Sequence, residues 1–113
     1  MKQIILFTMM FLFTTQMHAQ KPTDDFSGKW KTEDNHIITI TKSGDAFNGY
    51  SEKNILILED IVFNNDKWTG TIYDPKKGIK ASCSLILEGD TLKIEAWKGI
   101  FSKTLYWEKQ PSQ

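Results

Sequence analysis

The chain has 113 residues, carries 14 basic and 14 acidic side chains, and has a formal net charge of zero. This length allows one small domain with a modest core. The balanced charge gives no electrostatic reason to expect nucleic acid or an anionic membrane surface as a partner. All basic side chains are lysines, so the bidentate grip of arginine on phosphate or carboxylate is absent.

Residues 1–19 have the pattern of a secretory signal peptide. Lys2 supplies a positive start, residues 4–13 are almost all apolar, and Ala19 offers a small residue for cleavage. The apolar run is shorter than the roughly 20 residues that span a bilayer, so we expect no stable membrane anchor after cleavage. The pattern predicts an N-terminal signal helix and export to the periplasm or the medium.

Residues 20–25 are predicted to be a polar linker, and residues 26–110 a single domain of short strands between turn signals. In chain order, the expected strands are residues 27–32, 36–41, 46–50, 55–63, 67–73, 79–87, 91–97 and 103–109. The fourth is expected to be one bent strand or two short ones, broken at Glu59-Asp60.

Strands at hairpin spacing, with no room for crossover helices, predict antiparallel order in a sandwich or a closed barrel. We predict a small all-β barrel of eight strands, because closure hides both sheet edges. Alternation places an apolar set on the inner face. Its members are Trp30, Ile38, Ile40, Phe47, Trp68, Ile72, Ala81, Cys83, Leu85, Leu87, Leu92, Ile94, Leu105 and Trp107.

The opposite face is mostly polar, but it also carries four aromatic residues, Tyr50, Tyr73, Trp97 and Tyr106. Three interpretations are open. The four can be scattered surface residues or cross-strand pairs, they can lie under a loop or a partner subunit, or they can line a binding patch.

Groups that could support catalysis are few. His36 is the only histidine beyond residue 19, and it follows Asp34-Asn35, which favours a role in a turn. Cys83, the only cysteine, alternates with serines and is expected to be a small buried apolar side chain. The chain has no metal-ligand spacing and no glycine-rich phosphate loop. We therefore predict a protein that is not an enzyme and uses no metal or cofactor.

The start of the predicted domain resembles a known barrel type. Gly28-Lys29-Trp30, followed by Ile38-Thr39-Ile40 and Phe47-Asn48-Gly49-Tyr50, resembles the start of lipocalin-like (calycin) barrels, including avidin-type proteins. The resemblance implies that Trp30 plugs one end of the barrel. It also implies a basic residue over that indole near the end of the last strand, here Lys103 or Lys109 in place of the usual arginine.

A longer set of motifs resembles a bacterial family of small exported proteins defined by domain of unknown function 2147. The motifs are residues 68–78, Cys83, residues 85–87, residues 90–94, Gly99-Ile100 and Trp107. The chain departs from that family's pattern in three places. Glu95-Ala96 stands in place of Arg-Gly, Ser102-Lys103 in place of Gly-Arg, and Ala81 in place of an aromatic residue. The resemblance implies fold and export, and it transfers no activity.

The favoured function is non-catalytic binding of a small apolar or amphipathic ligand. The candidate ligand-binding residues are Trp30, Trp68 and Trp107 at a barrel mouth, or Tyr50, Tyr73, Trp97 and Tyr106 on the other face. The alternative is an envelope or secreted interaction protein or inhibitor that acts through the outer aromatic face. A hollow interior would favour the first function, and a filled interior with an exposed aromatic strip would favour the second.

Overall fold

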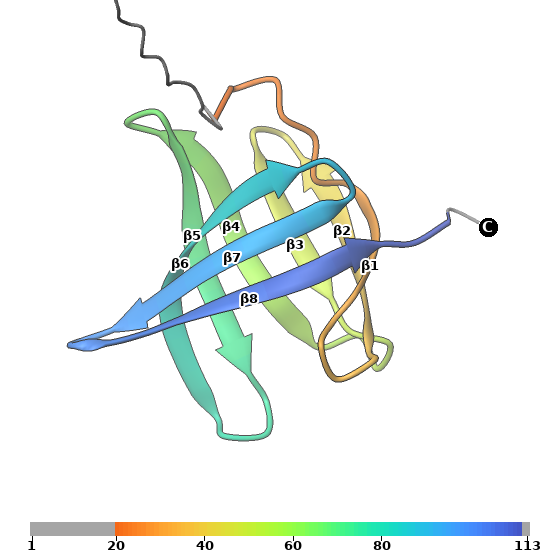
Figure 1. Ribbon diagram of the computed structural model, residues 1–113, viewed down its shortest axis with the longest axis vertical. Helices are drawn as coiled ribbons and strands as arrows, with labels where there is room; N and C mark the ends of the chain where they lie inside the picture. Colours follow the sequence, from red (N-terminus) through yellow and green to blue (C-terminus); the bar gives the residue numbers. More distant parts are fainter. Residues whose placement is uncertain (1–19, 112–113) are drawn as a thin grey trace, which may run out of the picture.

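The computed structural model describes residues 20–111, which form eight strands and no helix. The strands are β1 (Gly28–Lys31), β2 (Ile37–Ser43), β3 (Ala46–Tyr50), β4 (Leu56–Asn64), β5 (Lys67–Asp74), β6 (Ile79–Glu88), β7 (Thr91–Lys98) and β8 (Phe101–Lys109). Each strand pairs antiparallel with the next, and β8 pairs with β1 to close the barrel (Figure 1). The predicted all-β, eight-stranded, antiparallel barrel is confirmed. The predicted signal helix lies outside the described residues.

Within residues 20–111, no helix is long and apolar enough to cross a membrane.

The strands agree with the expected ones except near their ends. One difference is in β8, which begins at Phe101 instead of Lys103 and pairs Phe101 with Lys98. The turn between β7 and β8 is therefore only Gly99-Ile100, and both strands of this hairpin are longer than expected.

The bend expected at Glu59-Asp60 is a bulge inside one continuous strand, β4. The register against β5 shifts between Glu59 and Val62, and Asp60 has a φ of 54°. The amide of Asp60 donates to Oδ1 of Asn48 at 2.9 Å, which supplies the bulge with a partner from β3. Gly70 of β5 lies against this bulge, where an ideal Cβ would be 2.7 Å from the carbonyl oxygen of Asp60.

Most of the expected inner face is buried, with two informative differences. Four buried apolar residues lie outside the expected set, namely Phe26, Ile57, Leu58 and Ile61. The bulge explains Leu58 and Ile61, since an extra residue in β4 brings both inward despite their odd spacing. Conversely, Ile72, Ala81, Leu87 and Leu105 are only half-buried. Three of these half-buried residues line the cavity described below.

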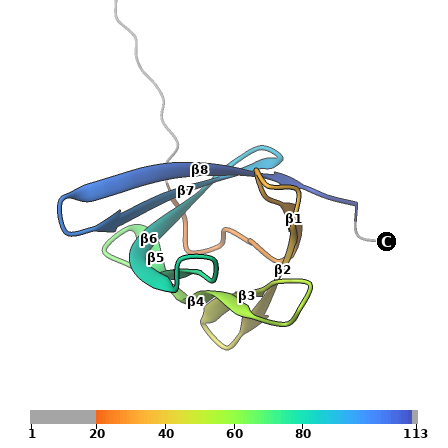
Figure 2. The ribbon, with the colours of Figure 1, turned by 90° about the horizontal axis from the view of Figure 1, so that it is seen from below.

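One end of the barrel is closed by residues 20–27, which we call the N-terminal strap. Figure 2 shows this segment crossing the ring of strands at its far end. The indole Nε1 of Trp68 donates to the carbonyl oxygen of Lys21 at 2.8 Å, and the amide of Trp68 donates to Oε1 of Gln20 at 2.6 Å. Residues 20–25, expected as a linker, thus contact the barrel wall.

Phe26 of the strap is the plug of the closed end. Its side chain is fully buried, and its ring centroid lies 5.3 Å from those of both Phe47 and Trp68 in edge-to-face geometry. The strap is also braced at Asp25, whose carboxylate accepts from the hydroxyl of Ser27 at 2.6 Å. This hydrogen bond, with one from the amide of Ser27, lowers the pKa of Asp25. The stability that the ionised Asp25 carboxylate contributes is therefore lost as the pH falls through that lowered pKa.

The Gly-x-Trp motif, residues 28–30, has a structural role at the same end of the barrel. Nε1 of Trp30 donates to the carbonyl oxygen of Phe26 at 2.9 Å. Nζ of Lys109 lies 4.9 Å from the centroid of the Trp30 ring and donates to the carbonyl oxygen of Ser27 at 2.9 Å. Gly28 has a φ of 128°, and a Cβ there would lie 2.7 Å from Nζ of Lys109. Glycine therefore leaves room for the lysine that covers Trp30.

Candidate functional site

The end of the barrel opposite the strap is open. The β1–β2, β3–β4, β5–β6 and β7–β8 turns lie at this end, because every second turn of an up-and-down barrel does so (Figure 1). A cavity of about 910 Å³ opens between these turns. It is lined by residues of the first three turns and by Lys98 and Phe101, the strand ends next to the β7–β8 turn. We call it the mouth cavity. Its volume falls within the range of roughly 300–1,000 Å³ that is usual for small-molecule sites.

The inner wall of the mouth cavity is apolar. Its inward-facing residues are Ile38, Ile57, Ile72, Ala81, Ala96, Leu105 and Trp107. Two of them, on the neighbouring strands β6 and β7, are alanines, and their short side chains leave space where larger residues would fill the barrel. The half-burial of Ile72 and Leu105 therefore reflects a hollow end of the core.

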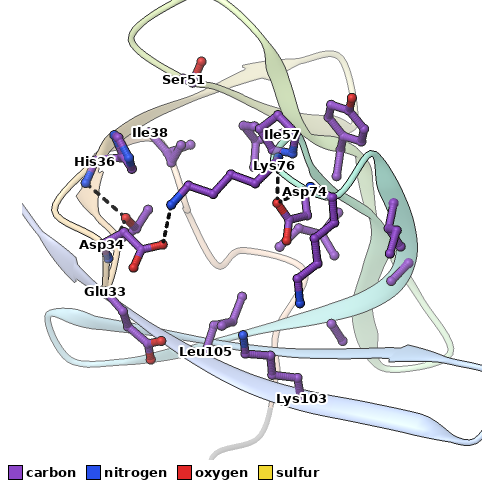
Figure 3. Close-up of a pocket in the computed structure, with 18 of the residues that line it drawn as sticks. Glu33, Asp34, His36, Ile38, Ser51, Ile57, Asp74, Lys76, Lys103 and Leu105 are labelled. Atoms are coloured by element: carbon purple, nitrogen blue, oxygen red, sulfur yellow. Dashed lines mark hydrogen bonds and ion pairs between the residues drawn. The ribbon is translucent and has the colours of Figure 1, made fainter.

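The rim of the mouth cavity is charged. Nζ of Lys76 lies 3.8 Å from Oδ2 of Asp34, so this ion pair reaches across the opening from the β5–β6 turn to the β1–β2 turn (Figure 3). Nδ1 of His36 lies 3.3 Å from Oε1 of Glu52. All four side chains are more than half exposed, so solvent screens both pairs and they hold the rim only weakly. Lys103 of β8 also points toward the opening (Figure 3).

Short hydrogen-bonded turns hold these charged groups in place. The amide of Thr32 donates to the carbonyl oxygen of His36 at 2.8 Å. The amide of Ser51 donates to the carbonyl oxygen of Ile55 at 2.9 Å. In the β5–β6 turn, the amide of Gly78 donates to the carbonyl oxygen of Asp74 at 2.8 Å. The rim therefore consists of defined turns, each closed by a main-chain hydrogen bond.

Three of the residues expected from the sequence to bind a ligand line the mouth cavity: Trp107, Tyr73 and Trp97. Trp107 is nearly fully buried in the wall, whereas Trp97 is 41% exposed. Tyr73 packs against the core, although alternation placed it on the outer face. The structure thus brings together residues that the sequence analysis had assigned to two different candidate sites.

The other four candidates lie elsewhere. Trp30 and Trp68 are buried at the closed end, where their indoles donate to the strap. Tyr50 is half-buried on β3, and Tyr106 is 47% exposed on β8. Neither tyrosine is part of the lining of the mouth cavity.

The sequence analysis missed the rim residues Asp34, Lys76 and Lys103 as part of a site, and it assigned His36 to a turn without a site. The predicted topology could have indicated these residues. In an up-and-down barrel, alternate turns share one end, so the charged residues of the first, third, fifth and seventh turns must lie near one another.

Cys83 is buried in the barrel wall on β6, opposite Gly70 and Ala96. Burial raises the pKa of its thiol from 9.0 to about 12. The thiol therefore stays protonated at neutral pH and is a poor nucleophile. His36 lies on the exposed rim and pairs with Glu52, so the two groups do not form one constellation.

We expect Cys83 to resist alkylation in the folded protein. At pH 8 the raised pKa makes the thiolate about a thousandfold scarcer than in the unfolded chain, and burial slows attack further. Labelling with iodoacetamide, with and without urea and followed by mass spectrometry, would measure this. Because the folded pKa is the higher one, the stability that the protonated thiol contributes is complete below pH 9.0 and is lost as the pH rises toward 12. Rapid labelling without urea would contradict the buried position.

Among residues 20–111, no group of three or more histidine, cysteine, aspartate or glutamate side chains is arranged to hold a metal ion. Fold and site together define a small up-and-down β-barrel that is closed at one end by its own N-terminal strap and open at the other to an apolar cavity. The chain belongs to the family described as uncharacterized protein conserved in bacteria (DUF2147), whose model matches residues 49–109. Comparisons with curated proteins and with solved structures gave no match.

Proposed function

We propose that the mouth cavity binds a small apolar or amphipathic molecule without transforming it, and that the protein does so after export. The observation that carries the proposal is the cavity itself, which is about 910 Å³ in volume and is lined by residues at the open end of the barrel. A barrel whose core was completely filled would offer no such space. Fold analogy alone would be a weak reason, since one fold serves many functions.

The chemistry of the lining supports an amphipathic ligand. Isoleucine, leucine, alanine and tryptophan side chains form the wall, so an apolar group gains free energy by entering. Lysines and carboxylates at the rim can meet a polar end group without desolvation in the interior. Ala81, where the family pattern has an aromatic residue, lies on this wall and widens it.

The distribution of reactive groups supports binding in preference to catalysis. A catalytic site needs a nucleophile or base that is oriented by a partner and reaches the bound molecule. Cys83 is buried and protonated, and the carboxylates of the rim are exposed and paired or placed in turns. The signal-peptide pattern of residues 1–19 supports a role outside the cytoplasm.

The test is to fill the mouth cavity and measure ligand binding. Ala81→Phe and Ala96→Phe together place two rings into the opening, and we expect the affinity for an apolar fluorescent probe such as N-phenyl-1-naphthylamine to fall at least about tenfold. Thr104→Phe is the matched control, because it adds the same ring at an exposed position of β8 outside the cavity lining. Its probe affinity should equal that of the unchanged protein.

The natural ligand can be sought in the same preparation. Protein purified from its own host would be extracted with solvent, and the extract would be analysed by mass spectrometry. Tryptophan emission should shift on extraction, since Trp107 lines the wall. If the protein binds no probe, carries no molecule and keeps its emission after extraction, the carrier function is wrong.

The alternative function, interaction with an envelope protein through the outer aromatic residues, stays a prediction. Only Trp97 and Tyr106 of those four are exposed by more than a third, at 41% and 47%. These two positions are where substitutions should weaken such an interaction.

A further inference from the structure

The hairpin of β7 and β8 projects beyond the body of the barrel, as both Figure 1 and Figure 2 show. At its tip, Ile100 is 94% exposed and Phe101 is 76% exposed. The turn is tight, with Gly99 at a φ of 61° in its first position. Two large apolar side chains are thus presented to solvent on a braced hairpin, an arrangement that nothing in the fold requires.

The charged side chains next to the tip of the hairpin are all positive. Lys98 and Lys103 flank the apolar pair, and residues 96–107 contain no aspartate or glutamate. The ammonium group of Lys98 donates to the carbonyl oxygen of Lys80 on β6 at 3.3 Å, which brings a third lysine near the base of the hairpin. Lys80 itself pairs with Glu59 at 3.6 Å, whereas neither Lys98 nor Lys103 forms an ion pair with a carboxylate of residues 20–111.

The shape of the tip narrows the choice of partner. It is a convex knob of two side chains, far smaller than the roughly 1,200–2,000 Å² in total that a stable protein interface buries. A second copy of the chain would bring the same lysines face to face, which is unfavourable. A lipid bilayer needs no complementary pocket, accepts apolar side chains into its interface, and attracts lysines when its headgroups are anionic.

We propose that the tip of the β7–β8 hairpin is a membrane-docking element, in which Ile100 and Phe101 enter the interface of an anionic bilayer while Lys98 and Lys103 contact its headgroups. Phe101, Lys98 and Lys103 also line the mouth cavity, so docking by the tip brings the open end of the barrel to the lipid surface. The docking does not depend on the cavity holding a ligand.

The test is co-sedimentation of the protein with vesicles. The protein is used as it is recovered from expressing cells, and mass spectrometry confirms that all variants have the same N-terminal residue. Binding to phosphatidylcholine vesicles containing phosphatidylglycerol should be strong at low salt and weaker with pure phosphatidylcholine. Ile100→Ser with Phe101→Ser should weaken binding about tenfold or more. Lys98→Gln and Lys103→Gln should each weaken binding to the anionic vesicles about fivefold.

Tyr106→Ser is the matched control, since it removes an exposed aromatic side chain from β8 away from the tip, and its binding should be unchanged. Trp97 gives a second readout, because the other three tryptophans are buried and it alone should be quenched by brominated lipid. The proposal is overturned if the unchanged protein does not bind anionic vesicles, or if the tip variants bind them with the same affinity as the unchanged protein. Tip-dependent self-association without vesicle binding would overturn it in favour of a second copy.

Discussion

Replacing Phe26 with alanine is expected to lower the free energy of unfolding by about 3–5 kcal/mol, the usual cost of deleting a buried aromatic ring. The ring is fully buried between Phe47 and Trp68, and no other residue of the strap enters the core. Its loss leaves an apolar hole at the closed end and removes the main anchor of residues 20–27. Urea unfolding, followed by tryptophan emission and circular dichroism, would measure the shift in midpoint.

Phe101→Ala is the control for this experiment, because the same side chain at the open end is 76% exposed. We expect that substitution to change stability by no more than about 0.5 kcal/mol. Equal effects of the two substitutions would mean that the strap does not close the barrel. Probe binding by Phe26→Ala, measured where the variant is still folded, should remain, since the mouth cavity lies at the other end.

Gly70→Ala is expected to destabilise the barrel by about 3 kcal/mol, at the upper end of the cost of overpacking a core. The new Cβ would lie 2.6 Å from Cδ1 of Ile61 and 2.7 Å from the carbonyl oxygens of Glu59 and Asp60. Two of these three contacts are with main-chain atoms of the β4 bulge, which cannot turn away as a side chain can. The same urea titration would measure the loss.

Two further variants separate the causes of the Gly70→Ala effect. Adding Ile61→Val removes the side-chain clash only, so most of the lost stability should not return. Gly44→Asn is the control, because nothing lies within 4 Å of its Cβ position and asparagine tolerates the φ of 61° there. Its cost should stay below about 1 kcal/mol. Full recovery with Ile61→Val would show that the bulge can move, contrary to the tight packing between β4 and β5.

Most of the fold could be predicted because its signals are local. Turn residues mark the ends of the strands, and alternation separates the inner face from the outer one. The bend at Glu59-Asp60 could be expected, but its form as a bulge could not. The extra residue in β4 shifts the alternation between Leu58 and Ile61, so both are buried at a spacing that a period of two does not predict.

The candidate site was predicted less well, and the reason is geometrical. Alternation says whether a side chain points inward, but its height along the barrel axis depends on strand tilt and register. Trp30, Trp68 and Trp107 all point inward, yet the first two plug the closed end and only Trp107 lines the mouth cavity. A set that looked like one site in the sequence therefore divides between opposite ends of the barrel.

The sequence by itself determined the all-β class, the positions of the strands along the chain, the Gly-x-Trp motif that contains Trp30 and the signal-peptide pattern of residues 1–19. All of these depend on neighbouring residues, or on a period of two, and so they survive without knowledge of contacts. Only the tertiary structure decided that Phe26 closes one end, that the other end is hollow, and that Ile100 and Phe101 project from it. Those features depend on which distant residues meet, or fail to meet, when β8 pairs with β1 and the barrel closes.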